Sequence, residues 1–134
     1  MIVGSGVDVI EIARVERALE HRGERFERRV FTPQEIETCR RARRPEQQFA
    51  LRFAAKEAAM KAVGTGWGQG VRWLDIETAP RAGARGGPEA GLRLTLRGRA
   101  AELAAERGGE RTHLALSRSR THAVAVVLLE GADD

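Results

Sequence analysis

The stretch Arg52-Phe-Ala-Ala-Lys-Glu-Ala-Ala-Met-Lys-Ala-Val-Gly-Thr-Gly66 reads as an amphipathic helix that ends in a glycine turn. Large apolar side chains recur at helical spacing within it and just before it, at Phe49, Phe53, Met60 and Val63. Gly64 stands where a helix-ending glycine belongs. Charged side chains occupy the remaining face: Arg52, Lys56, Glu57 and Lys61. Cations and a carboxylate beside a Gly-Thr-Gly turn predict a site for an anion that also needs a metal.

Length and composition predict a single domain spanning residues 1–134. The chain is 42% hydrophobic and 31% charged, which is typical of a soluble globular protein. No apolar run approaches the roughly 18–20 residues needed to cross a bilayer, so we expect no membrane partner. The N-terminus lacks the pattern of a secretory signal, and the single cysteine, Cys39, excludes an intrachain disulfide. We therefore expect a cytoplasmic protein.

The excess of positive charge predicts an anionic partner. The net charge is +4 and the isoelectric point is near 10.4, which favours nucleic acid, phosphates or an acidic protein. Residues 39–61 hold seven cations against two acids. Solvated arginines without a partner are the plainer interpretation of any one charge, but an acidic partner explains the cluster better.

The order of predicted elements is β-α-α-α-β-β-α-β-β, which indicates an α+β fold with helices packed on an antiparallel sheet. Thr32-Pro33-Gln34-Glu35 is a clear helix start, because Thr32 and Glu35 can form a capping box and proline suits the first helical position. We expect this helix to run to about Arg44, and the preceding one to be interrupted at Gly23. Strands are expected at residues 2–9, 72–78, 92–97, 113–118 and 122–130.

Asp8 and Glu57 are the candidate metal ligands. A carboxylate ending a buried strand and another in the middle of a packed helix are unfavourable unless they are paired or bind a metal. Two carboxylates with open positions for water and phosphate oxygens suit Mg²⁺. The alternative is that Asp8 caps the following helix and Glu57 pairs with Lys61.

The three cations Arg52, Lys56 and Lys61 beside the glycine turn suit a polyphosphate, because cations neutralise its charge and glycine lets backbone N–H groups come close. The turn is not a Walker loop, since its glycine spacing is wrong and it follows a helix. The alternative is a helix C-cap beside a solvated basic face.

Three segments resemble the holo-[acyl-carrier-protein] synthase family, the small bacterial 4′-phosphopantetheinyl transferases. They are Gly6-Val-Asp-Val-Ile-Glu-Ile-Ala-Arg14, Phe31-Thr-Pro-Gln-Glu35 and the opening stretch, residues 52–66. The resemblance covers residues 2–130 and is weakest at 80–111. It implies the fold of that family and an enzyme that transfers the 4′-phosphopantetheine group of coenzyme A to a serine of apo acyl carrier protein. Adenosine 3′,5′-bisphosphate would be released, and the reaction would support fatty acid biosynthesis.

The resemblance also implies roles for single residues. Asp8 and Glu57 match the Mg²⁺ ligands, and Glu57 and Lys61 match the catalytic pair. Arg14 matches a residue that docks the acidic carrier protein, and Arg17 and His21 extend the same basic row. The implied coenzyme A contacts are Arg52, Lys56, Lys61, Gly64, Thr65, Gly66, His113 and Arg118. The family is usually trimeric, with sites between subunits, so we expect a homotrimer. The resemblance implies no nucleic acid partner.

One strand departs from the family pattern. The family usually has His-x-Ser-x-Ser/Thr-His, whereas this chain has His113-Leu-Ala-Leu-Ser-Arg118, with Ala115 in place of serine. Arg118 can hold a phosphate as a permanent cation, but it cannot act as a base. Two rival interpretations follow: a family member that binds coenzyme A without turnover, and a nucleic-acid binder. The second leaves Asp8 and Glu57 unexplained and lacks a recognisable nucleic-acid motif.

Overall fold

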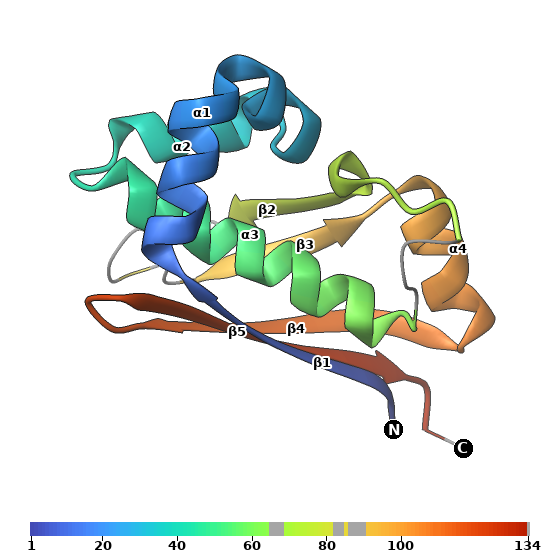
Figure 1. Ribbon diagram of the computed structural model, residues 1–134. Coiled ribbons are helices and arrows are strands. Elements are labelled where there is room, and N and C mark those ends of the chain that lie inside the picture. The colour runs from blue at the N-terminus through green and yellow to red at the C-terminus, as the bar shows by residue number, and fades with distance from the viewer. Residues whose placement is uncertain (65–68, 82–84, 86–90, 134) are drawn as a thin grey trace.

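The computed structural model describes residues 1–64, 69–81, 85 and 91–133. The α+β class and the predicted order of helices and strands are confirmed, with one short 3₁₀ helix added (Figure 1). The elements are β1 (Ile2–Glu11), α1 (Ile12–Val30), α2 (Pro33–Arg41), α3 (Pro45–Ala62), η1 (Trp73–Asp75), β2 (Ile76–Pro80), β3 (Leu92–Leu96), α4 (Gly98–Glu106), β4 (Gly109–Arg118) and β5 (His122–Gly131). No helix in these described parts is both long and apolar enough to cross a membrane.

The strands form two antiparallel sheets. One has the order β1-β5-β4, and the other is the β2-β3 hairpin. The first strand of the chain therefore pairs with the last, with Asp8 opposite Ala125. Figure 1 shows the helices on one side of the three-stranded sheet, with α3 lying across it and α1 and α2 beyond α3. A local pattern indicates strands, but which sheet each one joins depends on contacts between distant residues.

Helix α3 is the centre of the fold and is buried on nearly all sides. Twelve of its 18 residues are buried, so the sequence-based expectation of a simple amphipathic helix is wrong. Its alanines let β1 approach closely, and two glycines of β1 complete the fit. A Cβ at Gly6 would lie 1.9 Å from the Ala58 carbonyl oxygen, and a Cβ at Gly4 would lie 2.1 Å from that of Ala62. This contact fixes β1 against the helix that carries Glu57.

Helices α1 and α2 are joined by the predicted helix start. The Glu35 amide donates to Thr32 Oγ1 (3.2 Å), and the Thr32 amide donates to Glu35 Oε1 (2.9 Å), which confirms the capping box. Helix α2 ends at Arg41, slightly before the expected Arg44. Gly23 interrupts α1 as predicted, with a φ of 57°, but the chain resumes its helix and continues to Val30.

Candidate active site

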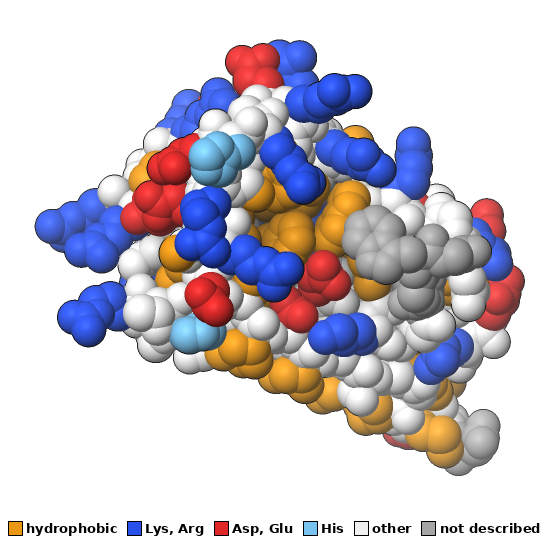
Figure 2. Space-filling view, in the orientation of Figure 1, with side chains coloured by type: hydrophobic (Ala, Val, Ile, Leu, Met, Phe, Trp, Pro, Cys, Tyr) orange, Lys and Arg blue, Asp and Glu red, His pale blue; other side chains and the backbone are white. Residues whose placement is uncertain are grey.

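Asp8 and Glu57 line the same cleft, of about 580 Å³, although they are 49 positions apart in the sequence. Strand β1 contributes Asp8, and the helix packed on that strand, α3, contributes Glu57. The three residues of the predicted docking row also line this cleft, from α1: Arg14, Arg17 and His21. Its floor includes Phe26 and Phe53. Figure 2 shows basic side chains gathered around an apolar hollow with acidic side chains at its edge.

The two carboxylates of the cleft act on each other electrostatically. Burial raises the pKa of Glu57, and the charge of Asp8 raises it further, whereas Lys61 and Arg14 lower it. Two neighbouring carboxylates repel each other, so each favours a cation that both can share. Among the residues that the structure describes, no group of three or more His, Cys, Asp or Glu side chains could hold a metal. A two-carboxylate set with room for water and phosphate oxygens fits Mg²⁺.

Lys61, in the last turn of α3, bonds to one of the carboxylates that line this cleft. Its Nζ donates to the Val7 carbonyl oxygen at 2.9 Å and to Asp8 Oδ1 at 3.2 Å. Helix α1 begins at Ile12, its N-cap residue is Glu11, and no described side chain caps it, so the capping alternative for Asp8 is wrong. Lys61 is half exposed and therefore accessible to a ligand as well as to Asp8.

Lys56, predicted to contact the coenzyme, lies in the protein interior. Its Nζ lies 2.8 Å from Glu35 Oε1 and donates to the carbonyl oxygens of Trp73 (3.2 Å) and Ile76 (2.5 Å). An ammonium has three N–H donors, and all three have internal acceptors here. Burial lowers the pKa of Lys56, and the Glu35 carboxylate opposes that shift. Lys56 therefore joins α3 to α2 and to η1, and has no donor left for a ligand.

Arg52 is also buried, but its hydrogen bonds are incomplete. Nη1 donates to Gln48 Oε1 at 2.7 Å and to the Gln48 carbonyl oxygen at 3.3 Å. Nη2 has no hydrogen-bond partner among the described parts of the chain. A buried guanidinium nitrogen without an acceptor is unfavourable, and such groups are uncommon in native structures. Within the described chain, Arg52 Nη2 is thus an unused donor on a side chain that bonds to Gln48, and Gln48 lines a second cleft.

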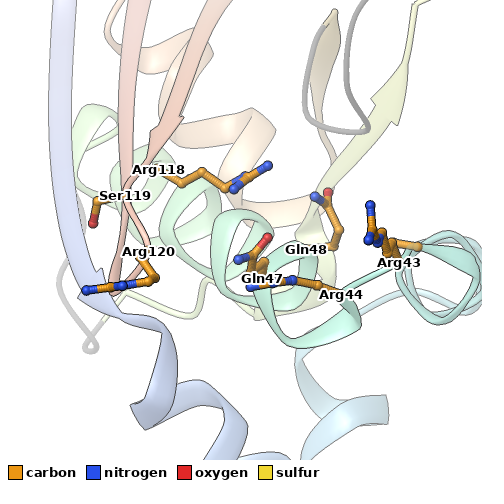
Figure 3. A pocket seen from close by; sticks show the side chains of 8 residues that line it. Arg43, Arg44, Gln47, Gln48, Arg118, Ser119 and Arg120 are labelled. Atoms are coloured by element: carbon orange, nitrogen blue, oxygen red, sulfur yellow. The ribbon is translucent and has the colours of Figure 1, made fainter.

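The second cleft is strongly basic and was not predicted. It measures about 600 Å³ and lies between the α2–α3 corner and the β4–β5 hairpin. Arg43 and Arg44 line it on the corner side, and Arg118 and Arg120 on the hairpin side; Figure 3 shows Arg118 directed toward Gln48. Arg118 was a predicted coenzyme contact, whereas Arg43 and Arg44 belong to the cationic cluster that was expected to face an acidic partner. The charge run was visible in the sequence, but its juxtaposition with the hairpin was not.

The remaining predicted residues are dispersed. His113 lies on β4, where its Nε2 is 3.0 Å from Glu130 Oε1. Gly64 follows α3 with a φ of 79°, in the left-handed region that glycine tolerates, and the Arg107 guanidinium lies against it. Thr65 and Gly66 lie outside the described residues. One chain therefore brings Asp8, Glu57 and Lys61 together but leaves His113 and Arg118 elsewhere.

Comparison with known proteins identifies the family. The model of the 4′-phosphopantetheinyl transferase superfamily matches residues 4–127. The chain is 42% identical over 130 residues to a holo-[acyl-carrier-protein] synthase of Koribacter versatilis, covering 97% of this chain and 99% of that one. The Neisseria meningitidis enzyme of the same name has a similar crystal structure, with a TM-score of 0.82, 31% identity, and coverage of 97% and 99%.

A third similar structure was determined with a ligand. It is the Helicobacter pylori holo-[acyl-carrier-protein] synthase in complex with coenzyme A, with a TM-score of 0.76, 27% identity, and coverage of 94% of this chain and 99% of that one. The chain described here belongs to the holo-[acyl-carrier-protein] synthase family of the 4′-phosphopantetheinyl transferase superfamily. The resemblance carried by residues 6–14, 31–35 and 52–66 is thereby confirmed.

Proposed function

We propose that this protein transfers the 4′-phosphopantetheine group of coenzyme A to a serine hydroxyl of an apo acyl carrier protein and releases adenosine 3′,5′-bisphosphate. The observation that carries the proposal is one cleft lined by two carboxylates and a basic row, with Lys61 hydrogen-bonded to one of the carboxylates, Asp8. The names of the relatives and the coenzyme A complex of a structural neighbour support the same substrates. The reaction serves fatty acid biosynthesis in the cytoplasm.

Asp8 and Glu57 hold the Mg²⁺ ion in this proposal. When bound, the ion supplies positive charge that stabilises the diphosphate and the leaving group. The mutual repulsion that contributes to the raised pKa of Glu57 supports a shared cation at this position. Two carboxylates leave room for phosphate oxygens, as magnesium sites require.

Glu57 and Lys61 act on the reacting groups. The serine oxygen bonds to the β-phosphorus of coenzyme A as the bond from that phosphorus to the bridging oxygen breaks. Glu57, which lines the same cleft as the docking row, accepts the serine proton. Lys61, half exposed beside Asp8, donates to a phosphate oxygen and stabilises the charge that develops there.

The carrier protein docks on the basic row of α1. Arg14, Arg17 and His21 are exposed and line the cleft that contains the carboxylates. An acidic partner placed there would bring its serine to Asp8 and Glu57. Because these charges are exposed, the association weakens with added salt, as screening shortens the field to about 8 Å at physiological ionic strength.

The second, basic cleft binds the phosphorylated nucleotide end of coenzyme A. Arg43, Arg44, Arg118 and Arg120 line it, which gives an anion several permanent cations. Arg52 supports the cleft from behind, because it holds the Gln48 side chain and has one unpaired Nη2. Gly64, Thr65, Gly66 and His113 complete the coenzyme contacts in this proposal.

The working unit is a homotrimer with sites between subunits. The face of the β1-β5-β4 sheet opposite the helices is apolar: Val7 and Val9 are 53% and 59% exposed. In the strand register they lie beside Val126 and Val124, and Val126 lies beside Ala115. Figure 2 shows a row of hydrophobic side chains along this side of the molecule. A second copy covering this face would remove Val7 and Val9 from water.

Mass spectrometry of the carrier tests the transfer. The protein is incubated with coenzyme A, Mg²⁺ and an apo acyl carrier protein, and we expect the carrier to gain one phosphopantetheine. Glu57→Gln should slow this gain by about 10²–10⁴. If coenzyme A binds but the carrier gains no mass, the protein is the non-catalytic family member that Ala115 and Arg118 raised as an alternative. If Glu57→Gln keeps the wild-type rate, the assignment of Glu57 is wrong.

A further inference from the structure

The Lys61 ammonium is hydrogen-bonded to Asp8, one of the two carboxylates that would hold the metal. Its Nζ is 3.2 Å from Asp8 Oδ1 and 2.9 Å from the Val7 carbonyl oxygen. On the basis of the function proposed above, we propose that Lys61 competes with the metal for Asp8 and leaves it when coenzyme A binds. Metal binding and coenzyme binding are thereby coupled through one side chain.

The geometry allows Lys61 to move. Its side chain is 53% exposed, whereas that of Asp8 is only 15% exposed. A lysine on the surface of a helix end changes rotamer easily, and its partner Asp8 is not fully buried, unlike Glu35, the partner of Lys56. An exposed ion pair of this kind contributes little to stability, so its exchange for another anion is nearly balanced. A coenzyme phosphate is such an anion.

The charges favour the exchange. Lys61 lowers the pKa of Glu57 as well as pairing with Asp8, so one ammonium stabilises both carboxylates in the absence of a divalent ion. A divalent cation at the same carboxylates repels the ammonium, and the metal alone must therefore displace it into water. When a phosphate is present, the displaced ammonium finds a new partner. Each ligand thus improves the affinity of the other by the same factor.

Manganese titration followed by electron paramagnetic resonance tests the competition, with Mn²⁺ in place of Mg²⁺. We expect Lys61→Met to bind Mn²⁺ about fivefold or more tightly than wild type in the absence of coenzyme A, within the usual range of coupling between sites. Saturating coenzyme A should strengthen Mn²⁺ binding in wild type and much less in Lys61→Met.

Two matched variants separate the possible outcomes. Arg14→Met removes one positive charge from the same cleft, where Arg14 also lowers the pKa of Glu57, but it leaves the Lys61–Asp8 pair intact. It should tighten Mn²⁺ binding less than Lys61→Met does. Equal tightening, or Mn²⁺ affinity in Lys61→Met at or below that of wild type, would overturn the competition. If Asp8→Asn binds Mn²⁺ as wild type does, the proposed metal site itself is wrong.

Discussion

Lys56 and Lys61 stand five residues apart on α3, and each lies next to a carboxylate, yet their surroundings are opposite. The Lys56–Glu35 pair is fully buried, and every donor of Lys56 has an acceptor inside the subunit. The Lys61–Asp8 pair is open to solvent on the lysine side. The same residue type on one helix thus stabilises the fold at one position and remains available to a ligand at the other. Burial and the number of internal acceptors decide between the two roles.

The buried Lys56–Glu35 pair is part of a larger network. Glu35 closes the capping box of α2, accepts from the Thr78 amide (2.9 Å) and hydroxyl (2.7 Å), and pairs with Lys56. It therefore ties α2, α3 and β2 together at one buried point. Removing a single partner from such a pair leaves an uncompensated charge, which is far more damaging than removing an exposed pair.

The largest expected effect is on stability. Lys56→Met should lower the free energy of unfolding by about 3–5 kcal/mol, because it leaves the Glu35 carboxylate buried without a cation. Lys61→Met should change it by about 0–1 kcal/mol. Chemical denaturation of both variants measures the difference.

A double variant controls for lost packing. Lys56→Met combined with Glu35→Gln removes both charges but keeps a side-chain oxygen for the cap, so it should recover part of the lost stability. If Lys56→Met and Lys61→Met unfold at the same denaturant concentration, the distinction between the buried Lys56–Glu35 pair and the exposed Lys61–Asp8 pair fails.

The second largest effect is expected on the reactivity of the Cys39 thiol, which is buried near Lys56 and Glu35. Burial raises its pKa to about 12, and Lys56 is one of the charges that act on it. At pH 8 it therefore carries almost no thiolate and should react with a thiol reagent only when the protein opens. Since 1.4 kcal/mol is a factor of ten, Lys56→Met should speed labelling by about 10² or more. Lys61→Met should leave the labelling rate near that of wild type; rapid labelling of native wild type would show that the region is not closed.

For coenzyme A affinity the order of the two variants should be reversed, with the larger effect from Lys61→Met. A hydrogen bond to a charged group contributes about 1.5–3 kcal/mol, so Lys61→Met should weaken coenzyme A binding by about tenfold or more. Lys56→Met, studied where it is folded, should bind with nearly wild-type affinity. Calorimetric titration measures both constants, and weaker binding in Lys56→Met alone would reverse the roles assigned here.

The smallest effect concerns pH. The pKa of Glu57 is raised above 4.5, so the folded protein holds this proton at pH values where the unfolded chain has lost it. The free energy of unfolding should therefore fall as the pH rises through the window just above 4.5. Glu57→Gln should remove that part of the slope, whereas an unchanged slope would mean that Glu57 is not perturbed. Lys61→Met should extend the window upward, because Lys61 lowers this pKa.

Local features of the fold were predictable, because their signals lie within a few residues. Thr32 and Glu35 specify the capping box, and Gly64 follows the last turn of α3 as expected. The second role of Glu35, as the partner of Lys56, was not predictable, since it depends on how α2 packs on α3. For the same reason Lys56 was grouped with the coenzyme contacts. The basic cleft was missed because its two walls are far apart in the sequence: Arg118 and Arg120 come 74 and 76 positions after Arg44. Only the packing of the sheet against the helices brings the hairpin to the α2–α3 corner.

The most direct test of the account is the rate at which the carrier protein gains one phosphopantetheine, compared between Lys56→Met and Lys61→Met at equal concentrations of folded protein. We expect Lys56→Met to keep a rate within a few fold of wild type. Lys61→Met should be slower by about 10², the typical effect of removing one group that stabilises charge in the transition state. The opposite order, with Lys61→Met active and folded Lys56→Met inactive, would contradict the account.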